Sequence, residues 1–246
     1  MLTRLTRLSV FALALLLGAC SRQPETLQGP LAVEARYRLL FNDTLVGGSL
    51  FTLQIGADGA YRIEAFTTPA GQMQQATAHE VLETSDGVIG HAAIQPARYE
   101  QSVLQGEQIE LVSLQFDWDR HRLRVLGKDM QRDLVLPPGT HDRLSYLLAA
   151  RDLAAAGEGV MQIQVASTEA SEETRLEVTG REAVEVPLGH YPAVGIRHVT
   201  PDPDQTRQLW FDTAFAPLPL RVLQVRDGNT VEMQLEDFSR RPSDPH

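Results

Sequence analysis

Short stretches of alternating apolar and polar residues dominate the chain from about residue 32 onward. The clearest is segment 230–236, with the sequence TVEMQLE, and segments 61–66 and 160–165 alternate in the same way. A period of two is typical of antiparallel strands that bury one face. The pattern predicts a mainly β protein, an antiparallel meander of about ten or more strands that forms a curved sheet or an incomplete barrel.

Three Asp-Gly pairs, at 58–59, 86–87 and 227–228, separate alternating segments. Aspartate and glycine tolerate the positive φ angles that tight hairpin turns need. We therefore expect a hairpin turn at each pair.

The segment 111–125 predicts a specific hairpin register. A turn centred on Trp118 and Asp119 would place apolar residues on one face and polar residues on the other. The apolar pairs would be Phe116–His121, Leu114–Leu123 and Val112–Val125, and the polar pairs Asp117–Arg120, Gln115–Arg122 and Ser113–Arg124. Because one register sorts both faces, it is the register expected of a half-buried hairpin.

One segment departs from the strand pattern and predicts the principal α-helix, at about 140–156. Thr140 or Asp142 could cap its start, and Gly157 would end it. Its apolar residues lie on more than one side, which predicts that sheet surrounds it. His141, Asp142 and Arg143 could also be interpreted as a catalytic group, but an acid near a helix start is favoured by the helix dipole without any other role.

Composition restricts the partners and the covalent chemistry. The 246 residues include 22 Lys or Arg against 32 Asp or Glu, for a formal net charge of -10. A polyanion needs a basic surface that this balance does not supply, so we expect no nucleic-acid partner. A single cysteine excludes an intramolecular disulfide and any Cys-rich metal site.

That cysteine, Cys20, ends a segment typical of an export signal. Two arginines precede the apolar run 8–17, which is too short to span a bilayer as a helix. Residues 17–20, LGAC, resemble the lipobox of bacterial lipoproteins. The resemblance implies cleavage before Cys20, acylation of that residue with chains such as palmitate and, because Ser21 follows, an outer-membrane location facing the periplasm. The alternative is an ordinary signal for secretion to the periplasm.

The chain therefore divides into four expected parts. These are a lipoprotein signal peptide at 1–19, a tether at 20–31, a single β-rich domain at 32–240 and a flexible tail at 241–246. Acyl chains give firm anchoring, so the folded domain needs no membrane-binding surface of its own.

The sequence contains no common signature of catalysis or cofactor binding. There is no G-x-S-x-G, P-loop or G-x-G-x-x-G motif. The seven histidines are His79, His91, His121, His141, His190, His198 and His246, and none has metal-ligand spacing. His190 and His198 would lie roughly 26 Å apart on one strand, too far to share an ion. We expect structural or surface histidines, no metal, no cofactor and no catalytic residue.

Two acidic pairs allow alternatives. Asp117 and Asp119 flank Trp118, a layout that could suit a carboxylate-dependent hydrolase of an envelope polymer. Asp202 and Asp204 could contribute to a calcium site, although two prolines beside them favour a plain turn.

Three arginines are the candidate ligand contacts. Arg120, Arg122 and Arg124 would form a ladder on one strand face, spaced about 6.6 Å apart. Such a ladder could contact phosphate or carboxylate groups, or it could be a solvated face balanced by neighbouring acids.

Several separated segments resemble the domain of unknown function 3108, a family of bacterial envelope proteins. The matching segments are 37–47, 96–99, 116–118, 138–145, 189–193, 210–212 and 218–221. The resemblance implies a β-rich periplasmic domain with one helix and no established activity. A more distant likeness is to outer-membrane lipoprotein carriers and receptors, in which an incomplete barrel encloses an apolar cavity.

These observations favour a non-enzymatic binding or envelope-maintenance factor, anchored to the membrane by its lipid and acting on an amphiphilic ligand or an envelope protein. The alternatives are the hydrolase and a purely structural scaffold, which would have a filled interior.

Overall fold

The computed structural model describes residues 27, 29–71, 79–90, 93–200, 202 and 204–241. The expected signal peptide, Cys20, most of the tether and residues 242–246 lie outside this part of the chain. His91 also lies outside it.

Fifteen strands and one α-helix make up the described residues. The strands are β1 (Leu31–Phe41), β2 (Thr44–Ile55), β3 (Ala60–Pro69), β4 (His79–Ile89), β5 (Ile94–Gln105), β6 (Gln108–Asp117), β7 (Arg122–Gly127), β8 (Met130–Val135), β9 (Thr140–His141), β10 (Val160–Ala166), β11 (Ser171–Val186), β12 (Gly189–Val199), β13 (Gln205–Phe211), β14 (Arg221–Arg226) and β15 (Asn229–Arg241). The helix is α2 (Ser145–Ala156).

All fifteen strands belong to one sheet, in the order β8-β7-β6-β5-β4-β3-β2-β1-β15-β14-β13-β12-β11-β10-β9. Each strand pairs antiparallel with its neighbours, except that β9 pairs parallel with β10. The first and last strands meet in the middle of the sheet, and β8 and β9 are its edges. The predicted antiparallel meander with one principal helix is confirmed, as an open sheet.

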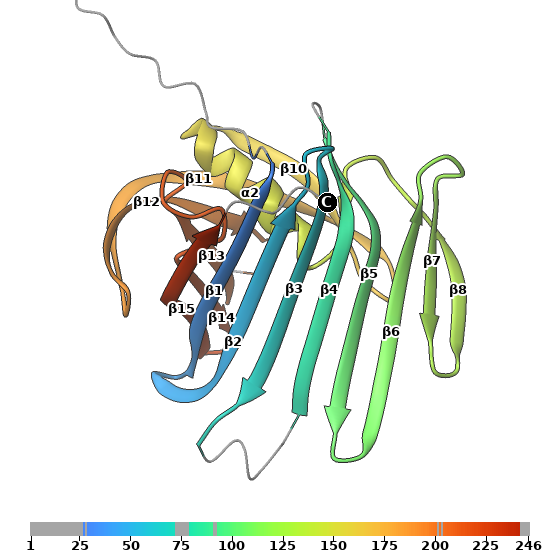
Figure 1. Ribbon diagram of the computed structural model, residues 1–246, viewed down its shortest axis with the longest axis horizontal. Coiled ribbons are helices and arrows are strands. Elements are labelled where there is room, and N and C mark those ends of the chain that lie inside the picture. Colours follow the sequence, from blue (N-terminus) through green and yellow to red (C-terminus); the bar gives the residue numbers. More distant parts are fainter. Residues whose placement is uncertain are drawn as a thin grey trace, which may run out of the picture.

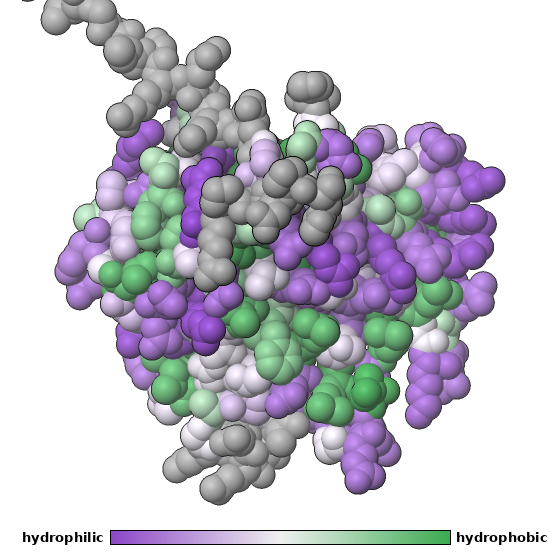
Figure 2. All heavy atoms as spheres, viewed as in Figure 1, coloured by the Kyte–Doolittle hydropathy of each residue, from purple (hydrophilic) through white to green (hydrophobic). Residues whose placement is uncertain are grey.

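Alternation of buried and exposed residues positions the core on the concave side of this sheet. In β3, Tyr61, Ile63 and Ala65 are buried, as the pattern of segment 61–66 predicts. Buried apolar residues from both halves of the sheet form one cluster. On the outer face seen in Figure 2, hydrophobic residues are scattered among hydrophilic ones.

Helix α2 lies between the two halves of the bent sheet (Figure 1), with contacts to β5 on one side and to β10, β11 and β12 on the other. Nine of its 12 residues are buried. The expectation that sheet surrounds the helix is therefore confirmed. It ends as predicted at Gly157, whose φ of 78° is the left-handed conformation that glycine adopts without strain.

The helix begins five residues later than the sequence pattern predicts. Thr140 and His141 are extended and pair with Gln164 and Val165 of β10. The Asp142 carboxylate accepts the backbone N–H groups of Leu144 and Ser145, and the Asp142 carbonyl oxygen accepts the N–H of Tyr146 at 3.2 Å, in the i to i+4 pattern of a helix. The N-cap position is held by Leu144, without a side-chain capping hydrogen bond, so neither Thr140 nor Asp142 is the N-cap as predicted.

The predicted apolar face of the β6–β7 hairpin is confirmed for Leu114, Phe116, Leu123 and Val125, which are buried. Ser113 of the predicted polar face is also buried, His121 is exposed in the turn, and the register is wrong by two residues. Leu114 lies opposite Val125, and Phe116 lies opposite Leu123. The turn spans residues 118–121 and ends at His121 with a φ of 48°. The Trp118 indole donates to the Pro96 carbonyl oxygen at 2.7 Å, which holds it beside β5 and lengthens the turn. A shift of two leaves every side chain on its face.

Two of the three expected Asp-Gly turns are present, at 58–59 between β2 and β3 and at 227–228 between β14 and β15. The expectation for Asp86 and Gly87 is wrong, because both lie within β4 at a register shift against β5. A Cβ on Gly87 would lie 2.3 Å from the Gln95 carbonyl oxygen. Glycine at this position allows β4 and β5 to approach closely, and it does not form a turn.

Candidate functional site: a cavity with unpartnered polar groups

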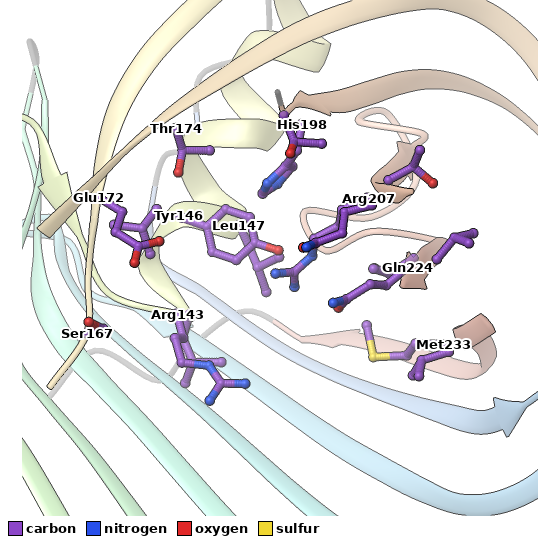
Figure 3. Close-up of a pocket in the computed structure, with 18 of the residues that line it drawn as sticks. Arg143, Tyr146, Leu147, Ser167, Glu172, Thr174, His198, Arg207, Gln224 and Met233 are labelled. Carbon is purple, nitrogen blue, oxygen red and sulfur yellow. The ribbon is translucent and has the colours of Figure 1, made fainter. Parts of the chain in front are cut away.

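A cavity of about 630 Å³ lies on the concave side of the sheet, beside the start of α2 (Figure 3). Its walls come from α2 and from strands in both halves of the sheet: β1, β2, β4 and β10–β15. Small-molecule sites in proteins are typically about 300–1,000 Å³. The fold therefore leaves space for a ligand where its two halves face each other.

A row of polar side chains crosses one wall of the cavity. His198 of β12 lies opposite Arg207 of β13, and Arg207 lies opposite Gln224 of β14. Directly paired residues of antiparallel strands put their side chains on the same face, about 4.5–5.5 Å apart. All three residues line the cavity.

The neighbouring row, two residues further along each strand, is apolar. Leu209 lies opposite Val222, Val222 opposite Met233, and Met233 opposite Leu39 of β1. Leu39, Val222 and Met233 line the cavity, together with Phe51 of β2. The cavity wall thus changes from polar to apolar within one step along the strands.

Tyr146 projects from α2 toward the polar row (Figure 3). The Arg207 guanidinium carbon lies 5.0 Å from the centre of its ring, and the His198 ring meets it edge-on at a centroid distance of 5.6 Å. Contact with an aromatic face orients the guanidinium without using its N–H donors.

Three polar atoms of this cluster are buried and have no hydrogen-bond partner among the described residues. They are the Tyr146 hydroxyl, His198 Nε2 and Arg207 Nε. Tyr146 as a whole is 2% exposed. Buried polar groups are normally paired, because an unpaired one carries its full desolvation penalty. The three atoms belong to residues that line one end of the cavity.

The titration behaviour of the cluster leaves Arg207 as its positive charge. Burial, with the nearby charge of Arg207, lowers the pKa of His198 to about 4, so the imidazole is neutral at pH 7. Burial raises the pKa of the Tyr146 hydroxyl, which stays protonated and can donate. Arginine is charged at any physiological pH.

Three glutamates also line the cavity, and none of them lies opposite Arg207 on a neighbouring strand. Glu83 accepts a hydrogen bond from the Tyr99 hydroxyl and lies 3.6 Å from the Arg143 guanidinium. Glu172 and Glu173 of β11 are exposed. Within the described part of the chain, no carboxylate forms an ion pair with Arg207.

A second buried polar network lies behind the helix start and has its partners. The Asp142 carboxylate accepts from the Leu144 and Ser145 N–H groups, each at 2.8 Å, and from the Ser85 hydroxyl at 2.7 Å. Ser85 also hydrogen-bonds Tyr61 at 3.1 Å. This network attaches the helix to strands β3 and β4, which explains Asp142 without a catalytic role.

The predicted arginine ladder is divided between a turn and a strand. Arg120 lies in the β6–β7 turn, whereas Arg122 and Arg124 lie on β7, because the turn is longer than predicted. Arg120 and Arg122 pair with Asp117, and Arg122 and Arg124 pair with Asp133. None of the three lines the cavity.

The acidic candidates lie elsewhere. The Arg120 guanidinium beside Asp117 lowers the pKa of that carboxyl, and Asp119 is exposed in the same turn. Asp202 accepts the N–H of Asp204 in an exposed turn.

Among the described residues, no group of three or more His, Cys, Asp or Glu side chains could hold a metal ion. In the same residues, no helix combines the length and hydrophobicity needed to cross a membrane.

Residues 36–236 match the family described as "Protein of unknown function (DUF3108)". The chain belongs to this family. Comparison with curated proteins gives no significant match. Among solved structures, this DUF3108 member is similar to the beta-barrel-like protein of domain of unknown function DUF1849 from Brucella abortus, at 10% identity and a TM-score of 0.57, over 86% of this chain and 98% of that one. At this identity the likeness shows the fold alone.

Sequence reasoning treats His198 only as a structural or surface histidine and does not single out Arg207, Gln224 or Tyr146. The signal was present in the strand pattern. Arg207 lies two residues from Leu209 on β13, and His198 lies two residues from Ile196 on β12, so each points to the same face as its neighbour. Leu209 and Ile196 are fully buried, so this face is the inward one. A polar residue in an inward phase of a strand is a candidate for a lining residue of a cavity.

Proposed function

We propose that this DUF3108 member is a lipid-anchored, non-enzymatic binding factor on the periplasmic face of the outer membrane, and that its cavity holds an amphiphilic ligand. The observation that carries the proposal is the cavity itself, with a polar row of side chains beside an apolar one. An amphiphile would pair its polar end with the first row and bury its apolar part against the second.

The anchor is supported by the sequence of the first twenty residues. A short apolar segment, followed by LGAC at 17–20, has the features expected of a lipoprotein signal. Acyl chains on Cys20 would hold the domain at the membrane surface, where amphiphiles are the abundant small molecules.

The alternatives receive less support from the geometry. A purely structural scaffold needs a filled interior, whereas side chains from both halves of the sheet leave a cavity of about 630 Å³. The hydrolase would depend on Asp117 and Asp119, but Asp117 is held by two arginines and neither residue lines the cavity.

Native mass spectrometry of the protein purified from membranes tests the proposal. We expect the wild-type protein to release a bound small molecule. Met233→Trp places a large side chain in the cavity and should abolish its retention. Glu236→Trp adds the same bulk at an exposed position of the same strand and should not. A wild-type protein that carries no small molecule, or equal retention by both variants, would contradict the proposal.

A further inference from the structure

We infer that Arg207, together with Tyr146 and His198, binds the anionic head group of the ligand, so that the cavity selects amphiphiles ending in a carboxylate or phosphate. This inference rests on the proposed function, and it specifies the class of ligand. It assigns a binding role to residues at the polar end of the cavity (Figure 3).

The charge of the site is the first argument. Arg207 is partly buried, and in the described residues no carboxylate neutralises it. The other arginine that lines the cavity, Arg143, lies near Glu83, and its side chain is 63% exposed. Partial burial of a cation strengthens its attraction to an anionic partner, because the surroundings screen the charge less than water does. An anionic ligand group would supply the missing pair.

The arrangement of donors is the second argument. The Tyr146 hydroxyl is a buried donor without a partner, and it lies in the same cluster as the unpaired Arg207 Nε. Carboxylate and phosphate oxygens accept several hydrogen bonds at once, and the planar guanidinium matches their geometry. His198 Nε2 is a third unpartnered atom, and the neutral ring can donate to an oxygen in one of its tautomers.

The position of the apolar row is the third argument, because it separates an amphiphile from a free anion. Arg207 and Leu209 are successive inward residues of β13, and Leu209 lies opposite Val222. From there the row continues through Met233 to Leu39. A chain attached to the head group would extend along this row, so the site should hold an acid with a chain more strongly than the same anion alone.

Binding of a fluorescent polyene fatty acid, compared with its methyl ester, tests the inference. The two probes have the same chain, and only the acid is charged. The protein is the full chain with Cys20→Ser, which removes the expected acylation site. Inorganic phosphate and acetate are added as competitors, to separate the head group from the chain. We expect the acid to bind at least about 10-fold more tightly than the ester, since hydrogen bonds to charged groups have that magnitude.

Variants assign the preference to its residues. Arg207→Met should weaken binding of the acid at least about 10-fold while changing binding of the ester less than about twofold. Tyr146→Phe, which keeps the ring beneath the guanidinium, should weaken binding of the acid by about 2- to 10-fold. Arg197→Met is the matched control, because Arg197 precedes His198 on β12 and is exposed beside Glu177. It makes the same charge change and should leave the preference intact.

The outcomes separate the inference from the proposed function. Equal binding of acid and ester, or equal weakening of both by Arg207→Met, would overturn the inference and leave the proposed function standing. Displacement of the acid by millimolar phosphate or acetate would show a site for free anions and overturn the amphiphile assignment. Absence of binding by either probe would contradict both. Thermal unfolding of each variant identifies any loss that arises from misfolding.

Discussion

Replacement of Asp142 by alanine should destabilise the fold strongly, whereas replacement by asparagine should not. The side chain is completely buried, and it accepts hydrogen bonds from two backbone N–H groups and from the Ser85 hydroxyl. Alanine would leave the two backbone N–H groups without this acceptor, whereas the Ser85 hydroxyl could turn to Tyr61. At about 1–3 kcal/mol for each unpaired buried group, the expected loss is about 2–6 kcal/mol. Domains of this kind are stable by about 5–15 kcal/mol.

Asparagine can keep the network by reversing one bond. Its oxygen accepts the N–H groups of Leu144 and Ser145, and its amide nitrogen donates to Ser85, which can donate to Tyr61 in turn because either hydroxyl is a possible donor in that pair. Asp142→Asn should therefore stay within about 1 kcal/mol of the wild type, or exceed its stability, since it also removes a buried charge.

Urea unfolding, followed by tryptophan fluorescence at pH 7, measures these differences. Asp119→Ala, at an exposed turn position, is the control and should change the free energy of unfolding by no more than about 0.5 kcal/mol. Burial raises the pKa of Asp142, so the native state binds the extra proton above the usual carboxyl range. Wild-type stability should thus fall relative to Asp142→Asn as the pH rises from the usual carboxyl pKa toward the raised pKa of the native state. An alanine variant as stable as the wild type, or an asparagine variant as unstable as the alanine one, would refute the reasoning.

Three further predictions concern other parts of the chain. Gly87→Ala should lower the free energy of unfolding by about 1–3 kcal/mol, because the new Cβ would lie 2.3 Å from the Gln95 oxygen and 2.7 Å from the Pro96 Cα. Denaturant titration measures this loss, and unchanged stability would show that the strands can separate there. Burial lowers the pKa of His141 from 6.5 to about 4, so stability should be lost as the pH falls between these values. His141→Leu should reduce the slope of the free energy of unfolding against pH by up to about 1.4 kcal/mol per pH unit, and an unchanged slope would contradict the assignment. Cys20→Ser should abolish labelling by a palmitate analogue and release the protein from membranes, and persistent labelling would exclude Cys20 as the acylation site.

Period-two alternation was sufficient to predict the strands and their buried faces, because the phase of side chains in a strand depends only on neighbouring residues. Tyr61, Ile63 and Ala65 are buried as predicted. The β6–β7 register was beyond that reasoning, because a shift of two residues preserves both faces and is decided by the contact of Trp118 with Pro96. The helix start was missed for a similar reason, because Thr140 and His141 pair with β10, a tertiary contact.

The candidate site could be predicted only in its parts. The inward phases of His198 and Arg207 can be read from their strands, and so can the apolar character of their neighbours. The registers of three strands decide that one row contains His198, Arg207 and Gln224. That Tyr146 faces this row depends on how the sheet bends around α2. Both are tertiary properties, which the alternation within single strands does not contain.

A crystal structure of the acylated protein, as purified from membranes in a detergent too large to enter the cavity, tests the central claim most directly. We predict continuous electron density for a chain along Leu39, Val222 and Met233, ending in a head group within hydrogen-bond distance of Arg207 and Tyr146. A cavity that contains only ordered water, or one closed by side chains from α2 and the sheet, would contradict it.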